Sequence, residues 1–201
     1  GGVGTVSRRQ VSFALAAIFL LALGLRVLAW FFEPPHHPDE FFQYLEPAWR
    51  HLTGAGVETW EWRRGVRSWV LPGYHGAWMA LIYRFGVRDG RVVARLLAAH
   101  WGVVSLTLVW AGWRGGLLLA RRRAWWAEPA NDAAAPPRGW QAGLLAALLC
   151  AAFPLLVRFS VHTLSELASL LCMVWALVLT GELAETPEGG RVAKTVGLGV
   201  L

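Results

Sequence analysis

Residues 11–32 read VSFALAAIFLLALGLRVLAWFF, a 22-residue apolar run that follows two arginines and contains one charged residue, Arg26. A helix needs about 20 apolar residues to cross the hydrocarbon core of a bilayer, so this run predicts a membrane-spanning helix. It is too long for the apolar part of a secretory signal peptide, and no small-residue cleavage site precedes Glu33. We therefore expect an uncleaved membrane anchor.

The composition of the whole chain agrees with a membrane protein. Of 201 residues, 56% are hydrophobic and only 16% are charged, and mean hydropathy is +0.43. These values favour a multi-pass membrane protein over a soluble domain. The net charge of +6 comes from arginines at the ends of apolar runs, which is typical of membrane flanks, so we expect no nucleic-acid partner.

Orientation and compartment follow from the basic residues, whereas the cysteines say nothing about compartment. Arg8 and Arg9 precede the first apolar run, which places the N-terminus in the cytoplasm by the positive-inside rule. Lys194 is the only lysine beside eighteen arginines, a bias that suggests a GC-rich bacterial genome and hence the bacterial inner membrane. Cys150 and Cys172 lie inside apolar runs, which indicates buried thiols rather than a disulfide.

Further apolar segments predict additional membrane helices at 69–86, 92–120, 140–161 and 164–181, with another beginning at 195–201. Residues 124–139 and 181–194 are predicted to be connecting loops. Arginine-rich stretches follow both 69–86 and 92–120, so one of these segments does not cross, or the first helices are re-entrant. Because the chain starts without Met and stops within an apolar stretch, we expect part of a longer protein.

The loop at 33–68 carries the stretch HHPDEFFQYLEP, at 36–47, where the chain leaves the membrane. From 39 to 52 the spacing predicts an amphipathic helix in the interface plane, with a kink or restart at Pro47 and an end at Gly54 and Gly56. Its apolar positions are Phe41, Phe42, Leu45, Trp49 and Leu52, and its polar positions are Asp39, Gln43, Glu46 and Arg50.

Asp39 and Glu40 are the candidate acid/base residues. Carboxylates at a membrane boundary are costly to desolvate, so water or a polar substrate must meet them. Neighbours on a helix point about 100° apart, so one can take a proton from an acceptor hydroxyl while the other binds the sugar. Capping of the helix is an equal alternative for Asp39. His36 and His37 could join the acids as metal ligands, but the spacing matches no familiar zinc pattern, so we expect no metal.

Two more polar clusters lie beside apolar segments. Thr59-Trp60-Glu61-Trp62 is either an interfacial aromatic belt or a platform for a sugar, and the following Arg67 either flanks a helix or holds a lipid phosphate. In the stretch 162–166, HTLSE, Glu166 is either a helix cap or part of a second loop that converges on the same site.

The order of these motifs resembles the glycosyltransferases of family 22. HPDEFFQYLEPAW at 37–49, TWEW at 59–62 and Arg67-Ser68 carry the resemblance, and HTLSE is a fainter match to an Arg-Thr-Leu-Ser-Asn-type loop in which Glu166 departs from Asn. The family belongs to the GT-C superfold and contains the polyprenyl-phosphate-mannose-dependent mannosyltransferases of GPI-anchor and N-glycan-precursor assembly.

The resemblance implies an all-α, multi-pass, GT-C-like fold, of which residues 1–201 are the N-terminal part of one catalytic domain. It implies transfer of a hexose, mannose above all, from a polyprenyl-phosphate donor to a glycan or glycolipid acceptor, with inversion, on the extracytoplasmic face and without a cofactor. Asp39 would be the general base, with Glu40 next. The implied substrate-binding residues are His37, Gln43, Trp60, Glu61, Trp62, Arg67, Ser68, His162 and Glu166.

Two alternatives come from other classes. In a transporter or channel, the polar residues inside apolar segments would mark a pathway at the middle of the bilayer. Those residues are Arg26, Arg95, His100 and Arg158. A non-catalytic membrane subunit is the other alternative. A polar cavity over 33–68 favours the enzyme, and a mid-membrane cavity favours the transporter.

Overall fold

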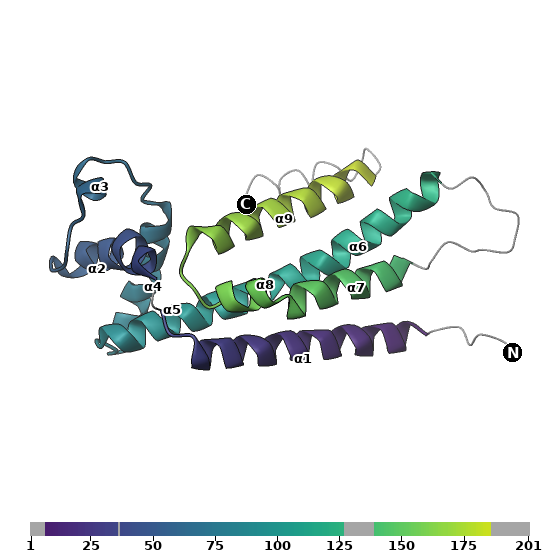
Figure 1. The fold of residues 1–201 in the computed structure, drawn as a ribbon, viewed down its shortest axis with the longest axis horizontal. Helices are drawn as coiled ribbons and strands as arrows, with labels where there is room; N and C mark the ends of the chain where they lie inside the picture. Colours follow the sequence, from purple (N-terminus) through teal and green to yellow (C-terminus); the bar gives the residue numbers. More distant parts are fainter. Residues whose placement is uncertain (1–6, 36, 127–138, 186–201) are drawn as a thin grey trace, which may run out of the picture. The chain divides into compact units, whose positions relative to one another are not determined.

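The computed structural model describes residues 7–35, 37–126 and 139–185, and within these ranges it is helical and contains no strand (Figure 1). This confirms the predicted all-α fold class. The elements, in chain order, are α1 (Arg8–Phe32), the π-helix η1 (Glu40–Leu45), α2 (Glu46–Thr53), α3 (Trp60–Arg63), α4 (Val70–Arg84), α5 (Gly90–Ser105), α6 (Thr107–Trp126), α7 (Gly139–Ala152), α8 (Pro154–Phe159) and α9 (Ser165–Glu185).

Three stretches of the described chain are long and apolar enough to cross a membrane: α1, the run Gly90–Arg121 that covers α5 and most of α6, and α9. Large apolar side chains along α1, among them Phe13, Leu20 and Phe31, are exposed rather than packed. Such surface is stable against lipid but not against water. The chain is therefore a multi-pass membrane protein.

The segment expected at 140–161 is two helices, α7 and α8, rather than one. Pro154 has no N–H to bond back into α7 and starts α8 instead. The predicted segment 92–120 is also divided, at Leu106 between α5 and α6. The predicted segment 195–201, His36 and most of the two predicted loops at 124–139 and 181–194 lie outside the described residues.

The chain divides into two compact units. The first contains Gly1–Leu25, Ser105–Leu156 and Ser169–Leu201, and its α6 and α7 lie side by side (Figure 1). Small residues allow this close approach: a Cβ on Gly116 would lie 2.5 Å from the Ala142 carbonyl oxygen, and one on Gly112 would lie 2.8 Å from Cys150 Sγ. Glycines four residues apart are a common way for membrane helices to pack backbone to backbone.

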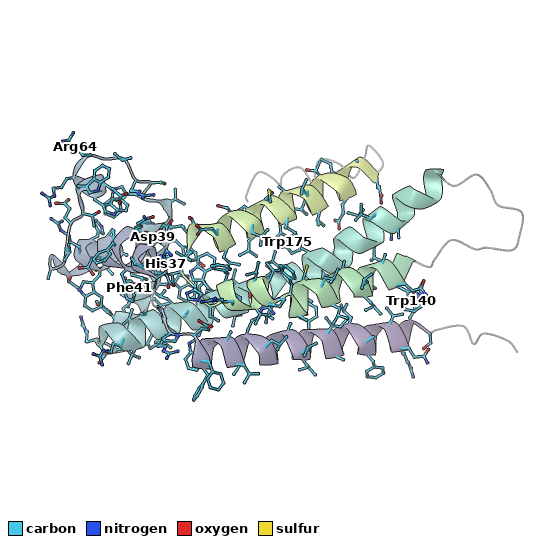
Figure 2. The ribbon with its side chains drawn as sticks, in the orientation of Figure 1. His37, Asp39, Phe41, Arg64, Trp140 and Trp175 are labelled. Atoms are coloured by element: carbon cyan, nitrogen blue, oxygen red, sulfur yellow. The ribbon has the colours of Figure 1, made fainter. Side chains whose placement is uncertain are left out.

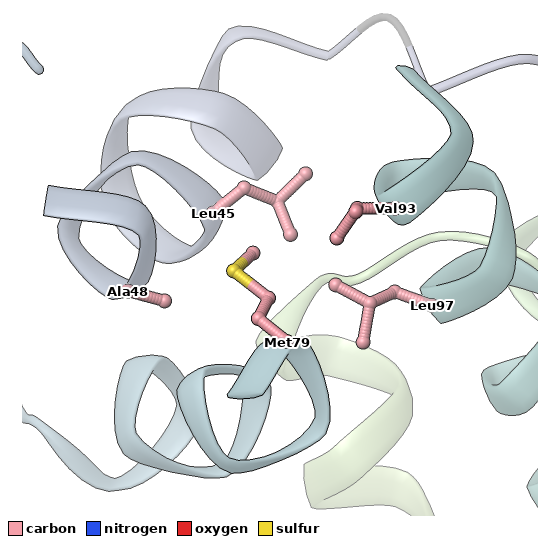
Figure 3. Packing of buried hydrophobic residues seen from close by; sticks show 5 residues of the cluster. All are labelled: Leu45, Ala48, Met79, Val93 and Leu97. Atoms are coloured by element: carbon pink, nitrogen blue, oxygen red, sulfur yellow. The ribbon is translucent and has the colours of Figure 1, made fainter. Parts of the chain in front are cut away.

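The second unit contains Arg26–Val104 and Val157–Ala168. Its core joins η1, α2, α4 and α5, and Figure 3 shows the side chains of that core pointing toward one another. The buried apolar residues of this core are Leu45, Ala48, Met79, Val93 and Leu97.

The stretch 39–52 differs from the single amphipathic helix that the sequence predicts. The first part is the π-helix, in which the Glu46 N–H bonds the Phe41 carbonyl five residues back. Because this changes the number of residues per turn, Glu40 and Leu45 are buried while Phe41 and Phe42 are exposed. The apolar positions that the sequence groups on one face are therefore divided here: Leu45 is buried in the core, whereas Phe41 and Phe42 are exposed.

The predicted restart and end of this helix are confirmed. Pro47 lies in the first turn of α2, where its missing N–H has no intrahelical acceptor to lose. Gly54 ends α2 with φ of +74°, a left-handed conformation that glycine adopts without the strain a side chain would bring.

Candidate functional site

Glu40 is fully buried and its carboxylate is surrounded by donors. His162 Nδ1 lies 2.9 Å from Oε2, and Thr163 donates its backbone N–H to Oε1 at 2.9 Å. The Thr163 hydroxyl at 3.4 Å and the His37 backbone N–H at 3.3 Å complete the set. An ionised carboxylate only accepts, so His162 Nδ1 carries the proton of this bond.

These contacts keep the Glu40 carboxyl ionised. Burial on its own raises its pKa, but the hydrogen bonds from His162, Thr163 and His37 favour the charged form and hold the pKa below its ordinary value of 4.5. A carboxylate with this many donors is a poor proton acceptor. The bonds of Glu40 to His162 and Thr163 instead connect the start of η1 to the turn before α9.

Asp39 lies in a different environment, although it is the adjacent residue. Its side chain is 50% exposed, its Oδ1 accepts a hydrogen bond from Gln43 Nε2 at 2.9 Å, and its Oδ2 lies 3.8 Å from His37 Nδ1. Figure 2 labels His37 and Asp39, which lie close together just before η1. The two acids therefore point apart, as the geometry of a helix requires, and Asp39 is the accessible one.

A second bond joins η1 to the start of α9. The Tyr44 hydroxyl donates to Ser165 Oγ at 2.8 Å, and the Ser165 hydroxyl donates to Glu166 Oε2 at 3.3 Å. His162 is buried in this turn, whereas Glu166 is exposed. The structure thus brings the HTLSE stretch against the HPDE stretch.

The TWEW stretch forms α3, close to η1. Trp62 Nε1 donates to the Phe42 carbonyl at 3.2 Å, and Arg67 Nη2 bonds Glu61 Oε1 at 2.6 Å. The bond to Glu61 raises the pKa of Arg67 and outweighs the opposing effect of burial, and the negative charge of Asp39 adds to the rise. Arg67 therefore carries its charge within electrostatic reach of Asp39.

Two predicted residues of this loop lie apart from the contacts around Glu40. Trp60 is exposed, and no polar contact of its side chain joins it to the acids. Ser68 is exposed and its Oγ accepts the Val70 backbone N–H at 3.3 Å, which stabilises the start of α4. The described contacts give Ser68 a local structural role.

Several residues around the acids were not identified from the sequence. Tyr44, Thr163 and Ser165 act through contacts between distant segments, and nothing local in their sequence distinguishes them. His75, fully buried in α4, accepts the Trp101 indole N–H at 2.9 Å, and the ring of Tyr44 packs edge-on against it. A histidine inside an apolar segment is a signal that the sequence itself contains. The sequence does not indicate that Trp101 is the partner of His75.

A metal site does not appear within the described ranges: no group of three or more His, Cys, Asp or Glu side chains there is arranged to hold an ion. His36 lies outside those ranges.

The model of the Alg9-like mannosyltransferase family matches residues 17–183, which is most of the chain and includes every site residue named above. The chain belongs to this family. The membership confirms the resemblance drawn from the HPDE, TWEW and HTLSE stretches.

Curated relatives of this Alg9-like family member match it over shorter stretches. Mannosyltransferase APTG1 of Arabidopsis thaliana is 46% identical over 56 residues, 27% of this chain and 10% of the relative. GPI mannosyltransferase 3 of Drosophila melanogaster is 42% identical over 59 residues, 29% of the chain and 10% of the relative. GPI mannosyltransferase 3 of Candida albicans is 42% identical over 68 residues, which is 34% of this chain and 13% of the relative.

The matched segment thus spans about a tenth of the length of these relatives. No solved structure matches the chain.

Proposed function

We propose that the protein transfers a hexose, mannose by its family, from a polyprenyl-phosphate-linked donor to a hydroxyl of a glycan or glycolipid acceptor, with inversion at the anomeric carbon. The family and the membrane helices support the reaction class. The observation that carries the proposal is the contrast between the two adjacent acids: Asp39 is accessible, whereas Glu40 is sealed among donors.

In the proposed reaction the acceptor oxygen attacks the anomeric carbon, the carbon–phosphate-oxygen bond breaks, and the polyprenyl phosphate leaves with the bonding electrons. The acceptor proton passes to Asp39, whose carboxylate faces outward from the start of η1. A positioned base of this kind contributes about 10²–10⁴-fold to the rate. Gln43, which bonds Asp39 Oδ1, would fix the direction of that carboxylate.

Glu40 fits a positioning role in this scheme. Its bonds to His162 and Thr163 hold η1 against the turn that precedes α9, so the backbone that carries Asp39 is fixed from two sides. Small displacements of reacting groups are costly in a displacement reaction, which is why a rigid support matters.

Arg67 is the proposed partner of the donor phosphate. Its Nη2 is bound to Glu61, which orients the guanidinium, while its buried Nε has no hydrogen-bond partner among the described residues. A planar, permanently charged fork suits a phosphate oxygen. The charge of Arg67 would stabilise the leaving group near Asp39.

The proposed location is the extracytoplasmic face of a bacterial plasma membrane. The arginines before α1 support a cytoplasmic N-terminus and hence an external 33–68 loop. A single cysteine at Val57, which is exposed, would test this: a membrane-impermeant thiol reagent added to intact cells should label it. Labelling only after lysis would place the 33–68 loop, and with it Asp39, on the cytoplasmic side and would contradict the proposed location.

The transporter alternative receives less support. Three of the four polar residues it requires are paired within the second unit: Arg95 bonds the Trp30 carbonyl, His100 bonds Tyr74, and Arg158 lies 3.8 Å from Glu33. The fourth, Arg26, is buried. Such pairing stabilises helix packing rather than lining a path for ions.

The test is Asp39→Asn in the full-length protein, assayed for transfer of labelled mannose from polyprenyl-phosphate mannose in lipid nanodiscs. We expect a loss of about 100-fold or more. Asp89→Asn is the matched control, because Asp89 caps α5 through the Arg91 and Val92 N–H groups and Asn caps equally well. Undiminished turnover in Asp39→Asn would remove Asp39 as the base.

A further inference from the structure

We infer that a cavity beside α2, distinct from the acid pair, binds one neutral sugar ring of the acceptor. This inference rests on the proposed function. The cavity has a volume of about 340 Å³ and lies between α2, the turn at 57–58, α3 and Trp69. That volume is at the lower end of the range of small-molecule sites, about 300–1,000 Å³, and suits a single ring with its substituents.

Two indoles form one wall of this cavity. The ring centroids of Trp62 and Trp69 are 4.7 Å apart, and the His51 ring lies 5.9 Å from Trp69. Trp62 is held by its bond to the Phe42 carbonyl, whereas Trp69 is more than half exposed. The negative face of an aromatic ring attracts the weakly positive C–H groups on the apolar face of a pyranose. An indole wall with one ring fixed is therefore suited to a sugar.

The lining of the cavity also includes a charge pair. Arg50 Nη1 and Glu58 Oε2 are 2.9 Å apart, and each side chain is 39% exposed. The pair offers donors and acceptors together, as neighbouring sugar hydroxyls require, and its net charge is zero. A phosphate would gain from Arg50 but be repelled by Glu58. Arg67 differs because it has a buried guanidinium nitrogen without a hydrogen-bond partner among the described residues, and Arg50 has none. The lining thus favours a neutral polyol over a lipid headgroup phosphate.

The place of the cavity also indicates the acceptor. Trp62 lines it and at the same time bonds Phe42, which is three residues beyond Asp39 on η1. A ring bound here would be part of the same chain of sugars whose hydroxyl reaches Asp39. The cavity would set which acceptor is used, while the acid pair sets the chemistry.

The experiment is saturation-transfer NMR on the full-length protein in nanodiscs, with methyl α-D-mannopyranoside as the probe and inorganic phosphate as competitor. We expect saturation of the mannoside that phosphate does not displace. Trp69→Ala and Arg50→Met should each weaken binding about tenfold or more, and Val66→Ala, exposed in the same loop and outside the cavity lining, should not.

Arg50→Met keeps the packing of the aliphatic stem, so it remains informative if Trp69→Ala does not fold. Equal binding in wild type and in a folded cavity variant would overturn the inference, as would displacement of the mannoside by phosphate.

Asp39→Asn separates the two proposals. It should lose transfer and keep binding. If the wild type binds the mannoside but shows no transfer, the inference about the cavity is supported and the proposed function is contradicted.

Discussion

Glu40 and His162 are bonded at 2.9 Å across 122 residues of sequence, and both side chains are almost completely buried. This bond fastens the first loop after α1 to the turn before α9. A buried bond between segments so distant fixes the relative placement of their neighbours, and here the neighbours include Asp39 and Tyr44.

Replacing Glu40 should affect stability more than chemistry. In Glu40→Ala the Thr163 N–H and His162 Nδ1 lose their acceptor inside the protein, and an unsatisfied buried donor costs about 1–3 kcal/mol. We expect a loss of about 3 kcal/mol in the free energy of unfolding, measured by denaturant titration in detergent. Glu33→Ala, which breaks a longer and more exposed pair with Arg158, should cost about 0–1 kcal/mol. Equal costs would contradict the fastening role.

Glu40→Gln keeps the shape and an acceptor for Thr163, so it distinguishes positioning from proton transfer. We expect transfer to fall by about tenfold or less, equivalent to about 1.4 kcal/mol, with the acidic limb of the pH–rate profile unchanged. An unchanged limb is what a positioning role of Glu40 predicts. Disappearance of that limb in Glu40→Gln would make Glu40 the base instead.

The lowered pKa of Glu40 predicts how stability changes with pH. The folded protein holds this carboxyl ionised more strongly than the unfolded chain does, so the extra stability is present above pH 4.5 and is lost as pH falls through the lower folded pKa. The melting temperature of the wild type should therefore drop more steeply below pH 4.5 than that of Glu40→Gln. Parallel curves would mean that Glu40 is not differentially ionised.

Tyr44 and Ser165 should be energetically coupled. Tyr44→Phe and Ser165→Ala each remove the hydrogen bond at 2.8 Å, so the double variant should lose less stability than the sum of the two single losses. We expect a coupling of about 1 kcal/mol from thermal unfolding followed by tryptophan fluorescence. Additive losses would show that the two residues do not interact in solution.

Two adjacent glycines in α6 should respond in opposite ways to alanine. A Cβ on Gly116 would lie 2.5 Å from the Ala142 oxygen, whereas one on Gly115 would meet only Val178 at an ordinary 3.6 Å. Gly115→Ala should gain up to about 1 kcal/mol from helix propensity, and Gly116→Ala should lose stability because α6 and α7 must separate. Similar melting temperatures for the two variants would contradict the close packing.

The local features of the fold could be predicted from the sequence. The length and apolarity of 11–32 fix α1, Pro47 marks where α2 begins, and Gly54 marks where it ends. Each of these depends on neighbours within one or two turns. Pro154 is the same kind of local signal, and it divides the expected segment 140–161 into α7 and α8.

The non-local features could not be predicted. The π-helix η1 is only six residues long, too short for its hydrogen-bond spacing to leave a periodic pattern in the sequence. The bonds from Glu40 to His162 and from Tyr44 to Ser165 join segments more than a hundred residues apart, and no local pattern specifies such pairs. The sequence predicted that the two acids diverge, but which of them is buried depends on these long-range contacts.

The π-helix has a consequence for insertions and deletions. One π turn holds one more residue than an α turn, so deleting a residue between Phe41 and Leu45 could restore ordinary α-helical bonding. The segment before the deletion would then keep about its present direction relative to α2, because the wider π turn already accommodates the extra residue. A frame-preserving codon loss here would therefore displace Asp39 less than the same loss within a regular α-helix, where each deleted residue rotates the preceding segment by about 100°.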